Sequence, residues 1–488
     1  MKTKLTALFL CTAALLLSCG EQQAETPAVG ETPDDPETAA QTEEASFPAY
    51  PGELTDFGGY TFTFLNQSDD FWTGAHHVLD YDTDTGESVE SAVYKRNRAA
   101  EEALNFHIAV EKDELQNMRT KMQKAVTAGE DAYDAVYLSL FYNQTSFGSS
   151  YVLNLKDIST LNLTEPWWNQ SYINSALLQG DVLYTSIDYV NLMGYAYINM
   201  ICFNRDMMRR LDLDMPYDLV RSGKWTYDAM LTYMKAAVSP GEQADFKYDI
   251  NGSAIYGFAC QHEEGPTVLL QGTGSYVIVR DKDNMPVLSP DITRLSDAAD
   301  KLTAMLSGDG YCVMTNEPNS SKGQGIGYFL GGRALFYHSS LGSCDSARFR
   351  ESDVEYGILP APKLDESQEQ YYSNLSQYTF ALNIPAVASD PERTGAIIDY
   401  LAYLSYRDVI PVLFESFCYK GVRDEDSIDI LNLLMDTETI DFGSAAGIST
   451  DFMTEISKQI VTGKTQFASA FEKKTKTMEK AIEKLFAE

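Results

Sequence analysis

The alternation of apolar and polar positions divides the chain into predicted strands and helices. Residues 60–65 alternate strictly between strand-forming residues and predict the first strand. Residues 88–106 carry apolar residues at helical spacing, and residues 106–110, 115–128 and 132–138 then predict a strand, a helix and a buried strand. Strands that alternate with helices indicate βαβ units around a parallel sheet, so we predict an α/β fold.

Loops that follow these strands are the first places where we expect a ligand. In open parallel sheets, ligands bind beyond the carboxyl ends of the strands. The loop after the first strand holds Trp72, and the loop after residues 132–138 holds Tyr142 and Asn143. We therefore predict that these three side chains contact a ligand.

Two later stretches have the pattern of crossings between two lobes. The apolar strands 182–187 and 196–204 are joined by a polar segment that contains glycine, and residues 378–385 form a second candidate crossing. We accordingly predict one lobe from residues 52–188 with 379–415, and a second from 189–378 with 416–488. Further predicted ligand contacts lie beside the crossings or at strand ends: Asp188, Tyr189, Tyr276, His338 and Tyr378.

Core packing is the alternative role for each aromatic residue in this set, because the chain has 30 tyrosines. Trp225 precedes a predicted helix whose N-cap is Thr226, and we interpret this tryptophan as structural. From about residue 426 the pattern predicts a mostly helical end of the chain.

The first 51 residues have a different pattern from the rest. Lys2 and Lys4 precede an apolar run at residues 5–17, which is shorter than the about 20 residues that cross a bilayer. The run ends in Leu-Leu-Ser-Cys at residues 16–19, which resembles the lipobox of bacterial lipoproteins. The resemblance implies that residues 1–18 are removed, that Cys19 is lipidated, and that the protein is anchored on the extracytoplasmic face of the cell membrane. A plain secretory signal that contains a cysteine is the alternative.

Residues 19–51 then predict a linker. From residue 20 to 51 there is no Lys or Arg, and acidic residues and prolines are frequent. Such a segment buries too little apolar surface to fold, so we expect an acidic, Pro-rich tether.

Charge and cysteine usage exclude several functions. The net charge of −34 disfavours nucleic acid and anionic lipid surfaces as partners. Five cysteines remain after Cys11 and Cys19, without the spacing of a zinc site, and we interpret them as buried thiols. The loop at residues 80–91 is similar to a calcium loop, but its glycine is one place late and its twelfth residue is Ser91. We expect no metal and no cofactor.

Several stretches together resemble a known family. They are GESVESAVYKRN at 86–97, GKWTYD at 223–228, GRALF at 332–336 and YGILPAPK at 356–363. With these, the chain resembles the extracellular solute-binding lipoproteins of bacterial ABC importers, in the branch related to the maltodextrin-binding protein. The resemblance implies a two-lobed periplasmic-binding-protein-like fold (type II) with a ligand cleft between the lobes. It also implies a permease as partner, a monomer, and a receptor without enzymatic activity.

Within this family we expect a carbohydrate, either a sugar or an oligosaccharide, as the ligand. Two alternatives stay open. A surface-anchored glycan-degrading enzyme would need two carboxylates about 5–10 Å apart across a cleft, and no motif in the chain supports one. A receptor for a non-sugar ligand, such as a peptide or a polyamine, would use the same fold.

Overall fold

In the computed structural model, residues 52–488 form one compact unit, which carries the fold. Among the described residues, no helix combines the length and the apolar character needed to cross a membrane. The structure describes residues 47–69, 76–143, 150–242, 246, 251–261, 264–308, 310–315, 325–344, 346–418 and 424–486.

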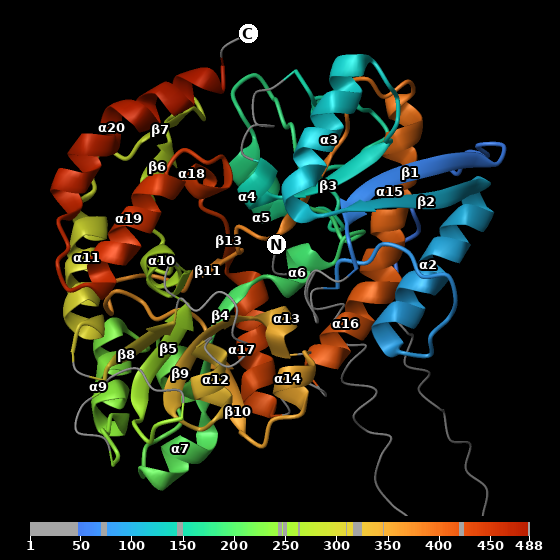
Figure 1. Cartoon of the computed structure of the whole chain (residues 1–488). Helices are drawn as coiled ribbons and strands as arrows, with labels where there is room; N and C mark the ends of the chain where they lie inside the picture. Colours follow the sequence, from blue (N-terminus) through green and yellow to red (C-terminus); the bar gives the residue numbers. More distant parts are fainter. Residues whose placement is uncertain are drawn as a thin grey trace, which may run out of the picture. The chain divides into compact units, whose positions relative to one another are not determined.

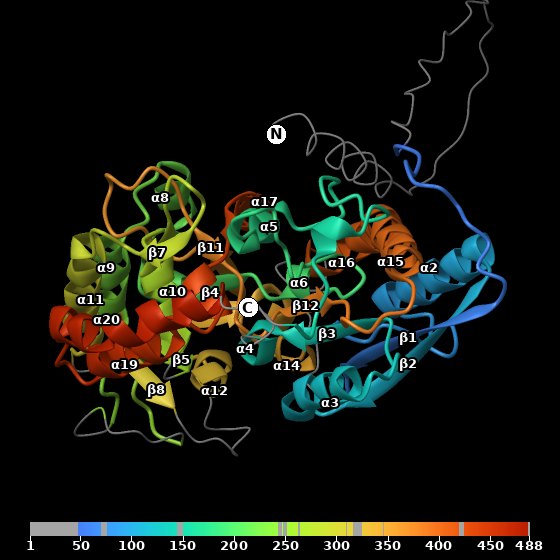
Figure 2. The same ribbon diagram turned by 90° about the horizontal axis from the view of Figure 1, so that it is seen from above.

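A first sheet has four strands in the order β12-β3-β1-β2. β1 (Tyr60–Gln67) runs parallel to β2 (Phe106–Asp113) and to β3 (Ala135–Ser139), and β12 (Phe380–Asn383) is antiparallel to β3. Helix α3 (Leu115–Ala128) covers one face of this sheet (Figure 2). The helices on the other face are α2 (Ser88–Leu104) and α15 (Pro391–Leu404). The predicted strands and helices of this region are confirmed.

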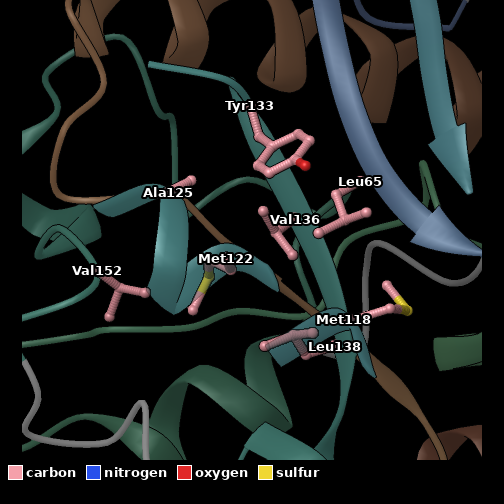
Figure 3. Packing of buried hydrophobic residues seen from close by; sticks show 8 residues of the cluster. All are labelled: Leu65, Met118, Met122, Ala125, Tyr133, Val136, Leu138 and Val152. Atoms are coloured by element: carbon pink, nitrogen blue, oxygen red, sulfur yellow. The ribbon is translucent and has the colours of Figure 1, made fainter. Parts of the chain in front are cut away.

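The core between α3 and this sheet is built from side chains that are close together in space and distant in sequence (Figure 3). Met118 and Met122 of α3 pack on Leu65, Val136 and Leu138 of the strands. Helix α3 ends where Gly129 adopts a left-handed conformation (φ 71°) and donates its N–H to the carbonyl of Ala125.

A second sheet has five strands in the order β10-β4-β9-β5-β8. β5 is parallel to β8 and β9, whereas β4 is antiparallel to β9 and β10. Trp225 is fully buried beside this sheet, and its Nε1 donates to the carbonyl of Pro360 (3.0 Å), which confirms its structural role. The strands are β4 (Asn199–Asn204), β5 (Tyr256–Gln261), β8 (Cys312–Thr315), β9 (Ala334–Ser340) and β10 (Tyr356–Leu359).

Helices that follow and surround this second sheet account for much of the remaining chain (Figure 1). The predicted helical end of the chain is confirmed by α17, α19 and α20. The helices are α7 (Arg205–Arg210), α8 (Tyr217–Arg221), α9 (Tyr227–Ala237), α10 (Glu264–Gln271), α11 (Thr293–Leu306), α12 (Gly325–Leu330), α13 (Leu341–Cys344), α14 (Ala347–Arg350), α17 (Glu425–Asp436), α18 (Phe442–Ala445), α19 (Thr450–Val461) and α20 (Phe467–Lys484).

The chain passes between the two sheets near residues 189–198 and 375–379, and again between α16 (Ile410–Ser416), which packs on α2, and α17, which packs on β10. Short strands meet at these passages: β11 (Ser373–Asn374) pairs with β13 (Glu438–Thr439), and Ile198 forms a bridge with Leu375. We call residues 197–199, 373–376 and 438–440 the hinge layer. The exact lobe boundaries stay predictions.

Of the remaining elements, β6 and β7 pack on α18 and α20, and the others lie around the first sheet or along the passages. A π-helix, η2, continues α15 and leads into α16, which packs on α2. These elements are α4 (Leu140–Asn143), the 3-10 helix η1 (Leu155–Asp157), α5 (Gln170–Ala176), α6 (Met193–Ala196), β6 (Ile278–Arg280), β7 (Pro286–Leu288), η2 (Ser405–Val409) and α16 (Ile410–Ser416).

Candidate functional site

A cavity of about 140 Å³ lies between the two sheets, above the hinge layer. Its walls come from α4 on the first-sheet side, from residues 375–378 of a passage, and from α10, α18 and α19 on the second-sheet side. The lining residues are Leu140, Phe141, Asn199, Glu264, Thr267, Val268, Gln271, Leu375, Ser376, Gln377, Tyr378, Ile440, Asp441, Ser444, Ala445, Thr450, Met453 and Thr454.

One wall of the cavity is aromatic. The rings of Phe141 and Tyr378 lie with their centroids 5.9 Å apart and their planes tilted by 33°. Tyr142 packs edge-on against Phe141 at 5.0 Å. The backbone fixes this arrangement, because the N–H of Phe141 donates to the carbonyl of Gln377 (2.8 Å). Two ring faces of this kind form a surface on which an apolar ring face can stack.

The opposite wall is polar. Glu264, Thr267 and Gln271 stand at spacings of three and four residues along α10, so they share one face of that helix. Asp441 begins α18: its Oδ1 accepts the N–H of Gly443 (3.0 Å) and its Oδ2 accepts the hydroxyl of Ser444 (2.6 Å). Burial raises the pKa of Asp441, while these hydrogen bonds oppose that rise.

The charges in the cavity have one sign. Among the described residues that line it, the ionisable side chains apart from Tyr378 are Glu264 and Asp441, and none is Lys, Arg or His. A wall of carboxylates, amides and hydroxyls satisfies ligand hydroxyl groups, and it repels an anionic ligand. The chemistry of the cavity therefore fits a ligand that is rich in hydroxyl groups and carries no negative charge.

A second cavity, of about 340 Å³, lies beside α11. Its two basic side chains, Arg294 and Lys301, are engaged in ion pairs within the same part of the molecule. Arg294 lies 3.6 Å from Asp365, and Lys301 lies 2.7 Å from Asp228. None of the described residues that line it is aromatic, so the cavity between the sheets is the better candidate site.

Four of the eight predicted contacts lie in this cavity or beside it. Tyr378 lines it, Tyr142 packs on Phe141, and Asn143 is buried in α4 with its Nδ2 donating to Thr185 Oγ1 (3.2 Å). His338 Nε2 lies 3.1 Å from Asn199 Oδ1. Burial lowers the pKa of His338 to about 4, so the ring is neutral, and its N–H orients the Asn199 amide that lines the cavity.

The structure places three other predicted contacts outside the cavity lining. Asp188 accepts hydrogen bonds from the hydroxyl of Tyr137 (2.9 Å) and from the N–H of Val190 (2.8 Å), and burial raises its pKa to about 6. The ring of Tyr189 stacks on Tyr406 at 5.9 Å. The hydroxyl of Tyr276 donates to Asn374 Oδ1 in the hinge layer (3.2 Å).

The eighth predicted contact, Trp72, lies outside the described residues, as does the predicted lipidation site Cys19. Ligand contact by any of the eight residues stays a prediction. The lining residues that we did not predict come from segments far apart in the sequence, among them Asn199, Gln271, Asp441 and Thr450.

The metal prediction concerned the loop that begins at Asp80. Its carboxylate accepts hydrogen bonds from Arg98 (2.8 Å) and Asn97 (2.7 Å). Within the described residues, no group of three or more His, Cys, Asp or Glu side chains has an arrangement that could hold a metal ion.

Comparison with known proteins gives matches among solved structures. No protein-family model matches the chain, and no curated protein matches it. The ABC substrate-binding protein Lmo0181 from Listeria monocytogenes, solved in complex with cycloalternan, is 12% identical with a TM-score of 0.54. The match covers 87% of this chain and 99% of that one.

Two further structures support the same fold. The cyclic alpha-maltosyl-1,6-maltose binding protein from Arthrobacter globiformis is 12% identical with a TM-score of 0.56, over 87% of this chain and 99% of that one. The maltose/maltodextrin-binding domain MalE from Bdellovibrio bacteriovorus, bound to maltotriose, is 14% identical with a TM-score of 0.53, over 87% and 100%. The chain thus has the two-lobed type II fold of ABC solute-binding proteins, which confirms the predicted fold class.

Proposed function

We propose that this protein binds a neutral sugar or oligosaccharide between its lobes and delivers it to the permease of an ABC importer. The observation that carries the proposal is the cavity itself. The rings of Phe141 and Tyr378 form one wall, and the carboxylates, amides and hydroxyls of the other wall face them without a basic side chain among the described lining residues. Proteins of this fold that were solved with cycloalternan or maltotriose support a carbohydrate.

Capture by lobe closure follows from the position of the cavity. Because its walls belong to both lobes, a ligand that contacts both walls favours the closed arrangement. Closure removes water from the site, which strengthens each hydrogen bond to a ligand hydroxyl. Polar groups left without partners would reject analogues that lack those hydroxyls. We expect capture without chemical change of the ligand, so we propose a receptor and not an enzyme.

A thermal-shift and calorimetric screen tests this proposal. The purified chain without residues 1–18 would be mixed with maltotriose, cycloalternan, tagatose and a trimer of galacturonic acid as the anionic control. We expect saturable stabilisation by a neutral sugar, no stabilisation by the anionic trimer, and intact sugar afterwards by chromatography. Hydrolysis of a bound sugar would show that the protein is an enzyme and not a receptor. Binding of the anionic trimer alone would contradict the proposed ligand class.

We also propose that Cys19 anchors the protein to the membrane on its extracytoplasmic face. The apolar run that ends in Leu-Leu-Ser-Cys supports this proposal, as does the acidic segment that follows. One acyl chain holds a protein on a membrane only marginally, so a stable anchor requires several chains on Cys19. We expect Cys19→Ser to move the protein from the membrane fraction to the soluble fraction without a change in sugar affinity. A variant that stays in the membrane fraction would refute the anchor.

A further inference from the structure

Much of the hydrogen-bond donor capacity of the cavity wall is used within the protein. Glu264 and Asp441 are carboxylates, which accept but do not donate when they are ionised. Ser444 Oγ and Gln271 Nε2 both lie within donating distance of Asp441 Oδ2, at 2.6 and 3.4 Å. Thr450 donates its hydroxyl to the carbonyl of Ser444 (3.2 Å). The donors that are left therefore decide which acceptor atoms of a ligand this wall can bind.

Asn199 is a lining residue whose amide nitrogen is not used in this way. Its Oδ1 lies 3.1 Å from His338 Nε2. Among the residues that the structure describes, its Nδ2 has no hydrogen-bond partner, and it is not one of the unpaired atoms that are wholly covered. An amide nitrogen carries two hydrogens, so Asn199 has a donor to offer to a ligand in the cavity that it lines.

The register of the second sheet brings His338 to Asn199. β4 and β9 are antiparallel, with Asn199 opposite Ser340 and Ile201 opposite His338. These four side chains lie on one face of the sheet, where Asn199 and His338 are diagonal neighbours at a spacing that an aromatic ring can span. His338 is not among the described residues that line the cavity. It therefore contacts Asn199 and leaves the lining position to the amide.

The charge state of His338 fixes the direction of this hydrogen bond. Burial lowers the pKa of His338 to about 4, so near pH 7 the ring is neutral and carries one N–H. The amide oxygen of Asn199 can only accept, so the ring proton lies on Nε2. Because the ring holds the oxygen, the amide keeps its nitrogen available as a donor.

We propose that His338 is a positioning residue for sugar binding, which holds the Asn199 amide so that Nδ2 donates to an oxygen of the sugar. Ring and glycosidic oxygens carry no hydrogen, so the carboxylates of the wall cannot bind them, whereas the amide nitrogen of Asn199 can. The amide is already oriented before the sugar binds, which reduces the entropy that binding costs. This inference rests on the proposed function and adds a donor to its polar wall.

Calorimetry with maltotriose, cycloalternan and tagatose tests the effect on affinity. We expect His338→Phe, which keeps a ring but removes the donor, to weaken binding of the sugar that the wild type binds by about fivefold or more. His338→Gln keeps an N–H at similar reach and should retain most of the affinity. Unchanged affinity in His338→Phe, with its melting temperature preserved, would overturn the proposal.

His77→Phe is the matched control. His77 is also buried, its Nε2 lies 2.9 Å from the carbonyl oxygen of Ser68, and it is not among the described residues that line the cavity. The substitution therefore removes a similar buried hydrogen bond away from the lining, and sugar affinity should stay unchanged. Equal weakening in the His77 and His338 variants would mean that loss of a buried histidine, and not the position of Asn199, causes the effect.

A double-mutant cycle separates a positioning role from a merely structural one. Asn199→Ala should weaken binding at least as much as His338→Phe does. If His338 acts through Asn199, adding His338→Phe to the Asn199→Ala variant should cause no further loss of affinity. The same fold-loss from His338→Phe in both backgrounds would show that the histidine acts independently of the amide, which refutes the proposal.

Nuclear magnetic resonance of the protein without sugar gives a readout that needs neither a binding partner nor a folded His338→Phe variant. The chain has five histidines, and labelling them with nitrogen-15 allows the His338 signals to be identified by their loss in His338→Gln. Near pH 7 we expect the proton on Nε2. A proton on Nδ1 would overturn the proposal, because Nε2 would then accept and the amide would turn its nitrogen to the ring.

The two measurements distinguish failure of the inference from failure of the proposed function. A proton on Nε2 without binding of any of the three sugars would support the orientation of Asn199 and contradict the proposed function. Sugar binding that His338→Phe leaves unchanged would support the proposed function and refute the positioning role of His338.

Discussion

Buried polar side chains at the passages between the lobes are held by several bonds each. Arg96 of α2 is buried, and its Nη1 donates to the carbonyl of Val190 (3.0 Å) and to Ser405 Oγ (2.9 Å). Its Nη2 donates to the carbonyl of Leu79 (3.1 Å). The Arg96 guanidinium thus links the passage at residues 189–198 to η2, the π-helix that follows α15.

Substitution of Arg96 should therefore lower the stability of the protein more than substitution of a surface arginine. We expect Arg96→Met to lower the free energy of unfolding by about 3 kcal/mol, because buried acceptors, among them the carbonyl of Val190 and Asn97 Oδ1, lose their donor. Urea unfolding followed by circular dichroism measures the change. Arg209→Ala, an exposed partner of Glu355, should cost less than about 1 kcal/mol. Equal losses in the two variants would show that the buried network contributes nothing.

Tyr378 is the predicted contact that lines the cavity, and its ring should carry affinity. We expect Tyr378→Ala to weaken binding of the stabilising sugar about tenfold, or about 1.4 kcal/mol, by calorimetry. Tyr378→Phe keeps the ring and should retain most of the affinity. Tyr94→Ala changes a tyrosine of α2 that does not line the cavity and serves as the control. If Tyr378→Ala binds the sugar with full affinity, the Tyr378 ring does not contribute to the binding site.

At the scale of elements, the start of α9 is a feature that a few neighbouring residues in the sequence predict. Thr226 was predicted as its N-cap, and the structure confirms that Thr226 Oγ1 accepts the N–H of Ala229 (3.3 Å). We expect Thr226→Ala to lower the free energy of unfolding by about 1 kcal/mol, whereas Thr226→Ser keeps the acceptor and most of the stability. Chemical unfolding compares the two variants. Equal losses would mean that packing and not the cap is responsible.

Elements with a clear local pattern could be predicted from the sequence, and short helices without such a pattern could not. The alternation at residues 60–65 and the apolar spacing after Ser88 are local properties, and β1 and α2 follow them. Helix α18 has only four residues, and α10 has eight, so the polar face of α10 extends over only about two turns. The cavity depends on both helices, so most of its polar wall escaped prediction.

The same reasoning explains which candidate contacts reached the cavity. Tyr378 could be predicted to line the cavity because it lies at a passage between the lobes. Gln271 and Asp441 are far apart in the sequence, and only the tertiary fold brings them together. Tyr276 contacts Asn374 of the hinge layer, whereas Asp188 is bonded to Tyr137, and ligand contact by either residue stays a prediction. Which face of a strand a residue takes depends on the register of the hinge strands, and the sequence pattern does not show that register.

At the scale of the whole molecule, a buried carboxylate between the lobes makes stability depend on pH. Glu438 Oε1 accepts Asn169 Nδ2 (2.5 Å), and burial raises the pKa of Glu438 from 4.5 to about 7. The folded protein therefore binds this proton more tightly than the unfolded chain does. The stabilisation is complete below about pH 4.5 and is lost as the pH rises to about 7.

Glu438→Gln should remove this dependence. We expect the variant to melt about 2 °C above the wild type at pH 8, and to lose that advantage at pH 5, where Glu438 is protonated. Asp188, with a pKa raised to about 6, titrates in the same direction and stays in both proteins as a shared background. A melting difference that is the same at both pH values would contradict the raised pKa of Glu438.

The position of β12 at the edge of the first sheet has a consequence for how the chain folds. Asn383 pairs with Val136, which lies 247 residues earlier, and the whole second sheet is encoded between them. During synthesis the first three strands leave the ribosome with an unpaired edge beside β3. That edge is covered only after all strands of the second sheet have been made. Because contacts between distant residues form slowly, we expect the pairing of β12 with β3 to be a late step of folding.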